Sequence, residues 1–202
     1  MKSNGSVFAY LFKPFRFIAG KESLFIGLAV LALLFVLGYW SNTHFNGVLD
    51  AHYVCLTKQD QAWVHAVYQL VAWFSLVMVL YPMGRIFSSS SVRFIDMAGT
   101  LAMARFPLFL LALWGFNPDV HPCMEGINPF DTEAVMSILG DKVGLLVWTG
   151  LFSIAVVIWY IVVLYNAYSV SSNLKGPRGG WSFATGLIIS EIISIVLLIY
   201  IL

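Results

Sequence analysis

Charge is scarce in this sequence of 202 residues, since Asp, Glu, Lys and Arg together make up only 10% of it. Soluble domains contain roughly 25% charged residues. The chain is also 60% hydrophobic and has a mean hydropathy of +0.85, which is the composition of an integral membrane protein. The net charge of +1 gives no basic footprint, so we expect the lipid bilayer as a partner and no nucleic acid.

The familiar catalytic motifs are missing as well. The sequence has no Gly-x-Ser-x-Gly elbow, no His-Glu-x-x-His helix and no Gly-x-x-x-x-Gly-Lys phosphate loop, which are signatures of common hydrolases and nucleotide-binding proteins. It also lacks an internal repeat with a period of about 20 to 50 residues and a linker that would divide domains. We therefore expect one domain over residues 1–202, with no enzyme activity, no cofactor and no metal.

Five apolar stretches are each long enough to cross a bilayer as a helix, which takes about 20 residues. The predicted fold class is therefore all-α, a bundle of five transmembrane helices. Residues 1–23 mix Phe and Leu with Lys and Arg around Pro14, which indicates an amphipathic segment in the membrane interface. We interpret residues 176–180, Gly-Pro-Arg-Gly-Gly, as a turn before the last span. The predicted spans are residues 24–40, 62–87, 94–116, 143–168 and 182–202.

Basic residues are divided unequally between the two sides of these spans. Eight Lys and Arg residues fall on one side and two on the other, and the side rich in Lys and Arg is normally cytoplasmic. We therefore expect a cytoplasmic N-terminus, an exoplasmic C-terminus and a multi-pass protein of the cell membrane, which is the inner membrane if the source is prokaryotic. The basic side carries Lys2, Lys13, Arg16, Lys21, Arg85, Arg93, Lys175 and Arg178, and the other side carries Lys58 and Lys142.

The third span contains three residues that are costly in a bilayer: Asp96, Arg105 and Pro107. A charged side chain near the bilayer centre costs roughly 3 kcal/mol on insertion scales, so both charged groups should face protein. Pro107 has no amide donor and crowds the carbonyl group of Met103, which predicts a helix kink near Arg105. We expect this span at the centre of the bundle.

Arg105 and Glu191 are predicted to lie at similar depths. At 1.5 Å per residue, Arg105 is roughly 16 Å along its span and Glu191 roughly 14 Å along the fifth. We hypothesise an interhelical ion pair between them, because small residues such as Ala102 and Gly186 would let the two helices approach. The alternative is that these charged groups line a route for an ion, a proton or a lipid.

Asp96 is a second buried acid that needs a different partner. It lies nine residues before Arg105, which puts it on the opposite face of the helix. The candidates for its partner are Arg85, Arg93, Lys175 and Asn166.

The two cysteines, Cys55 and Cys123, fall one in each predicted exoplasmic loop. Three interpretations remain open: a disulfide between the loops, unrelated free thiols, or a zinc site in which His52 and His121 join the cysteines.

The chain resembles the Yip (Ypt-interacting protein) domain family of five-span membrane proteins. The resemblance lies in FAYLFKPFRFIAG before the first span, in AGTLAMARFPLFLLAL within the third, and in a fourth span that opens with Trp148 and closes in YNAYSVSSNLK. It implies an all-helical, non-enzymatic membrane protein with a cytosolic N-terminus, and structural roles for Gly99 and Pro107. Eukaryotic members act in vesicle trafficking and bind small GTPases; this chain is similar to the short prokaryotic members.

Two functions follow from these observations. The first is membrane organisation or the binding of a membrane or cytosolic protein partner, as in the Yip family. The second is a small transporter or permeation pathway that uses Arg105 and Glu191. An odd number of spans argues against two equal inverted repeats within one chain, and a homo-oligomer stays open for either function.

Overall fold

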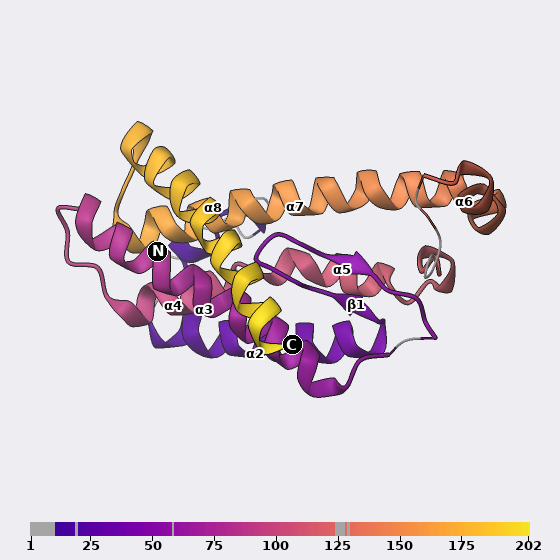
Figure 1. The fold of residues 1–202 in the computed structure, drawn as a ribbon. Coiled ribbons are helices and arrows are strands. Elements are labelled where there is room, and N and C mark those ends of the chain that lie inside the picture. The colour runs from indigo at the N-terminus through magenta and orange to yellow at the C-terminus, as the bar shows by residue number, and fades with distance from the viewer. Residues whose placement is uncertain (1–10, 19, 58, 124–127, 129) are drawn as a thin grey trace.

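The computed structural model describes residues 11–18, 20–57, 59–123, 128 and 130–202. Almost all of its regular structure is helical (Figure 1). Its main helices are α2 (Lys21–Trp40), α3 (Ala62–Phe87), α4 (Phe94–Met103), α5 (Phe109–Trp114), α6 (Thr132–Leu139), α7 (Val143–Ser172) and α8 (Gly176–Ile201). Short 3-10 turns are η1 (Pro14–Arg16), η2 (Phe106–Leu108), η3 (Pro118–Val120) and η4 (Gly140–Lys142), and the two strands are β1 (Thr43–His44) and β2 (His52–Tyr53).

Five helical segments among the described residues are long and apolar enough to cross a membrane, which confirms this part of the sequence prediction. The second span begins and ends at the predicted residues, Ala62 and Phe87. The predicted start of the last span, residue 182, was wrong, because Gly176–Gly180 forms the first turn of α8 and not a turn before it. Pro177 suits this position, because the amide groups of the first helical turn have no acceptor within the helix, and the amide hydrogen that proline lacks is not needed there. The reversal lies instead at Asn173, whose left-handed φ of 56° ends α7.

The third span is interrupted at Pro107, where the sequence analysis expected a kink. Helix α4 ends at Met103, η2 follows, and α5 continues in the same direction. The amide of Leu108 donates to the carbonyl of Arg105 at 3.0 Å, which recovers one backbone bond at the break. The third span is also the central one: 72% of its most apolar window is buried, against 22–39% in the other four.

Small residues do bring helices close together, but the helix pairs differ from the expected pair of the third and fifth spans. Helix α4 packs mainly on α2, and α8 packs mainly on α3. A Cβ atom added at Gly27 of α2 would lie 2.7 Å from that of Ala102, and one at Gly186 of α8 would lie 2.6 Å from Leu80. The small stripes of the third and fifth spans therefore face α2 and α3 rather than each other.

The described part of the N-terminal segment is packed onto α7. Phe15 is buried, and the indole of Trp159 donates to the carbonyl of Leu11 at 3.2 Å. The rest of this predicted amphipathic segment, residues 1–10 and 19, lies outside the described residues.

The connection between α2 and α3 is an antiparallel hairpin that folds back into the helical bundle. Thr43 pairs with Tyr53 and His44 with His52. Figure 1 shows β1 lying between α2 and α5 instead of projecting beyond them. Phe45 and Val48, between the strands, are each only 1% exposed. We call residues 42–54 the hairpin and its end of the bundle the hairpin end; the opposite end, which carries Arg85, Arg93, Lys175 and Arg178, is the basic end.

Candidate functional site

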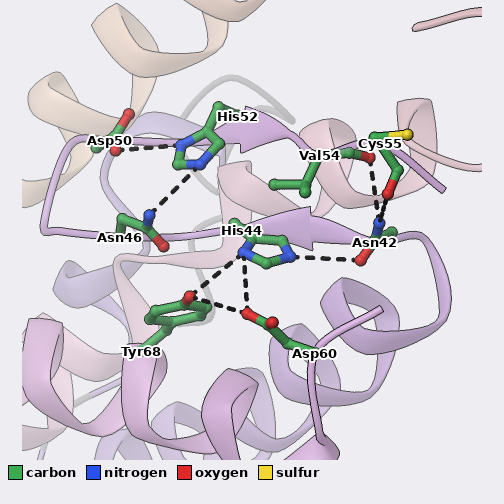
Figure 2. Close-up of polar contacts among 9 residues, drawn as sticks. All are labelled: Asn42, His44, Asn46, Asp50, His52, Val54, Cys55, Asp60 and Tyr68. Atoms are coloured by element: carbon green, nitrogen blue, oxygen red, sulfur yellow. Dashed lines mark hydrogen bonds and ion pairs between the residues drawn. The ribbon is translucent and has the colours of Figure 1, made fainter. Parts of the chain in front are cut away.

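The largest concentration of polar contacts lies where the hairpin meets α3. Figure 2 shows His44 of β1 at its centre, with Asn42 on one side and Tyr68 and Asp60 on the other. His44 is only 4% exposed, so each polar atom of its ring needs a partner within the protein. The hairpin supplies Asn42 and His44, while α3 supplies Tyr68 and the residues just before α3 supply Asp60.

The contacts of His44 fix which of its nitrogens carries the proton. The amide nitrogen of Asn42 donates to the carbonyl groups of Val54 and Cys55, at 3.1 Å each, so its oxygen points at His44. That oxygen only accepts, and it lies 3.3 Å from Nε2 of His44. Nε2 is therefore the donor, and Nδ1 lies 3.3 Å from the hydroxyl group of Tyr68, which also donates to the carboxylate of Asp60 at 3.4 Å.

His44 is held in its neutral form by its surroundings. Burial, and then the nearby His65, lower the pKa of His44 from 6.5 to about 4, while Asp60 acts in the opposite direction. The ring of His65 lies 4.8 Å from that of His44, so a second positive charge would be close. Asp60 approaches Nδ1 at 3.7 Å and is half-exposed. The cluster is thus a neutral imidazole between a buried tyrosine and an acid at the surface.

A pocket of about 390 Å³ adjoins this cluster. Tyr68 lines both the pocket and the cluster, and Asn46 and Asp50 form the rest of the polar wall. The opposite wall is apolar and comes from the last turns of α8, including Leu198 and Leu202. Tyr68 is a hydrogen-bond donor beside the neutral His44, and the pocket can hold a small polar group next to them.

The tip of the hairpin is bound by Glu191 of α8. Its Oε2 atom accepts the amide hydrogens of Val48 at 2.7 Å and Leu49 at 3.0 Å, and the hydroxyl group of Ser194 adds a weaker contact to Val48 at 3.3 Å. Gly47 lets the backbone come this close, because a Cβ atom there would lie 2.8 Å from the carboxylate. Glu191 satisfies backbone donors that would otherwise be buried without a partner.

Arg105 lies in a separate polar contact deeper in the bundle. Its side chain is completely buried. The guanidinium donates to the amide oxygen of Gln69 at 3.0 Å and to the hydroxyl group of Tyr160 at 3.3 Å. Both partners are neutral, so the cation is solvated by dipoles instead of a carboxylate.

The expected ion pair between Arg105 and Glu191 is not formed. In the described part of the chain no salt bridge joins them, because each group is occupied elsewhere: Arg105 by Gln69 and Tyr160, and Glu191 by the hairpin. The physical reason is that α8 packs on α3 and not on the third span. Gln69 was missed because a search for opposite charges ignores neutral acceptors.

Asp96 lies in the first turn of α4 at the basic end and is only partly buried, so it is not the second buried acid that the sequence predicted. Its carboxylate approaches Gly20, at the start of α2, rather than a partner in α7. None of the salt bridges described for this structure joins it to Arg85, Arg93 or Lys175, and Asn166 donates to the carbonyl of Val162 within its own helix.

Cys55 and Cys123 form a disulfide, one of the three alternatives left open by the sequence. It ties the hairpin to the connection after α5, with a Cα–Cα distance of 4.7 Å. The zinc alternative is wrong, because both thiols are used and the ring nitrogens of His121 contact the carbonyl groups of Val54 and Gly115 at 2.7 Å each. Among the described residues, no group of three or more His, Cys, Asp or Glu side chains could hold a metal ion.

Tyr53 fastens the second strand to α5. Its hydroxyl group donates to the carbonyl of Leu111 at 3.1 Å, and burial raises its pKa to about 12. The donor therefore stays protonated at any physiological pH, and the hairpin is held at both its strands and its tip.

Comparison of the chain with protein-family models, with curated proteins and with solved structures finds no match in any of the three.

Proposed function

We propose that the chain is a multi-pass membrane protein of the Yip-domain type that organises membranes or binds a protein partner and has no enzymatic role. The observation that carries this proposal is the internal use of the buried charged groups. Arg105 binds Gln69 and Tyr160, and Glu191 binds the hairpin. Groups that line a route must exchange partners with a passing ion or solute, whereas these are committed to holding the fold.

The orientation that we propose places the basic end in the cytoplasm and the hairpin end outside. The excess of Lys and Arg at the basic end supports this, and so does the disulfide, since disulfides persist in oxidising compartments outside the cytoplasm. The N-terminal segment is then cytoplasmic and is available to a partner next to α7.

Capture of partners from native membranes tests this function. We expect a tagged chain to retain its partner when Glu191→Gln is introduced, and to lose it when Leu11→Ser and Lys13→Glu change the cytoplasmic surface. Both positions are exposed, while the anchoring Phe15 is left intact. Lys142→Glu, an equal charge change at the hairpin end, is the control; because it also breaks the salt bridge to Asp119, its unfolding temperature is measured alongside. Partners lost equally in the control would contradict the proposal.

A second function, permeation of an ion or small solute, is favoured by one observation. The pocket beside Asn46, Asp50 and Tyr68 leads to the titratable His44 cluster. Flux into proteoliposomes measures this function directly. Flux that Glu191→Gln abolishes in a folded protein would replace the first proposal; the absence of flux in the wild type would exclude the second.

A further inference from the structure

A cavity of about 660 Å³ lies at the basic end, between the last turns of α3 and the first turns of α8. The two helices touch at Gly186, which packs against Leu80 and Met83. Helix α8 runs obliquely across the bundle (Figure 1), so it diverges from α3 on the side of the contact nearer its start. Ligand pockets in proteins typically have volumes of about 300–1,000 Å³, so the space is large enough for part of a lipid.

The lining of this cavity is apolar with a few polar groups at one end. Met83, Ile86 and Phe87 come from α3, while Arg178, Trp181 and Thr185 come from α8. Ile86 is 74% exposed and Trp181 is 77% exposed, so the cavity opens sideways at the level of the helix ends. Apolar side chains exposed on candidate spans contact acyl chains, and Trp prefers the depth of the headgroups.

The charge of the cavity is positive. Arg178 lines it, and no acidic residue is among its lining residues. Lys175 lies directly before the first turn of α8, three residues from Arg178, and is exposed. Basic pockets between membrane helices on the cytoplasmic side bind the headgroups of anionic lipids.

We propose that this cavity binds one anionic glycerophospholipid from the bilayer. Arg178 faces the phosphate group, the hydroxyl group of Thr185 and the indole of Trp181 lie beside the glycerol, and Ile86 and Phe87 contact the first part of the acyl chains. This site uses neither the hairpin nor the N-terminal segment, but it rests on the orientation proposed above, which places the basic end in the cytoplasm.

Native mass spectrometry of the full chain released from nanodiscs tests the site. The nanodiscs contain equal amounts of phosphatidylglycerol and phosphatidylcholine. We expect wild type to retain phosphatidylglycerol preferentially, and Arg178→Gln to weaken its retention about fivefold, the factor that corresponds to roughly 1 kcal/mol for one cation at a membrane surface. Arg178 is exposed, so the variant should fold normally, with an unchanged unfolding temperature.

Two further variants separate a specific site from general surface charge. Arg85→Gln removes an equally exposed cation on α3 that does not line the cavity, so it should change retention by less than about twofold. Thr185→Trp places a bulky side chain in the cavity without adding charge, so it should weaken the retention of the bound lipid. Soluble glycerol 3-phosphate should not displace the lipid, because it lacks acyl chains.

Three results would overturn the proposal. Wild-type protein that retains both lipids equally has no anionic site. Equal losses in Arg85→Gln and Arg178→Gln would show only attraction to surface charge. Unchanged retention in Thr185→Trp would place the lipid elsewhere on the protein.

Discussion

Removing the carboxylate of Glu191 should release the hairpin, and the size of the effect can be worked out from its contacts. The same oxygen atom accepts both amide hydrogens, from Val48 and Leu49. A hydrogen bond to a charged group contributes about 1.5–3 kcal/mol. Glu191→Ala leaves both donors without their acceptor, and because the site is half-buried, we expect a loss of about 3 kcal/mol in the free energy of unfolding.

Glu191→Gln should destabilise the protein much less than Glu191→Ala. An amide oxygen can take the place of the single oxygen that accepts both bonds, so only the charge assistance is lost. We expect a cost of about 1 kcal/mol. With roughly 2–4 °C per kcal/mol for a chain of this size, the unfolding temperature should fall by about 6–12 °C for the Ala variant and about 2–4 °C for the Gln variant.

Thermal unfolding in nanodiscs and hydrogen exchange at the two amides measure these effects. If the hairpin opens locally, the amides of Val48 and Leu49 should exchange about 100-fold faster in Glu191→Ala, as roughly 3 kcal/mol implies. Glu133→Ala removes an exposed carboxylate in α6 and should change neither quantity. If Glu191→Ala has the wild-type unfolding temperature, and its two amides exchange at the wild-type rate, this account of the hairpin is refuted.

Three more predictions concern the interior of the bundle. Gln69→Leu should destabilise the protein by about 3 kcal/mol, more than Arg105→Met at about 1–2 kcal/mol, because only the former leaves a buried cation without its acceptor; equal unfolding temperatures would contradict this. Gly47→Ala should lower the unfolding temperature by several degrees, since its Cβ atom would meet the carboxylate of Glu191, whereas Gly144→Ala meets nothing within 4 Å and should be neutral or stabilising. The folded state takes up the proton of His44 only near pH 4, while the unfolded chain takes it up near 6.5. The free energy of unfolding should therefore fall by roughly 3 kcal/mol as the pH drops from 6.5 to 4. If His44→Gln shows the same fall in a denaturation series over this pH range, His44 is not its cause.

The sequence predicted the helical architecture well because the signals for it are local. Apolar stretches give the five candidate spans, and the missing amide of Pro107 gives the break in the third. The error at Gly176–Gly180 has a local cause too: a glycine-rich run favours a turn, but Pro177 equally favours the first turn of a helix.

The polar contacts could not be predicted in the same way, because they depend on which helices pack together. Depth along a span is a one-dimensional quantity, and matching Arg105 to Glu191 by depth ignores direction around the bundle. The true partners, Gln69 and Tyr160, are on α3 and α7. The hairpin had no reliable local signal either: Asn46-Gly47 favours tight two-residue turns, but the loop between the strands is residues 45–51 and neither residue has a positive φ.

The contact between the hairpin and α8 has a consequence for how the protein is made. Val48 lies 143 residues before the glutamate that binds it. At translation rates of about 5–20 residues per second, roughly 7 to 30 seconds separate the synthesis of the two. Throughout that interval the amides of Val48 and Leu49 lack the acceptors that α8 provides. The strands can pair and bind α5 before then, but the tip of the hairpin is closed only when α8 inserts beside it, and without α8 the amides of Val48 and Leu49 stay open.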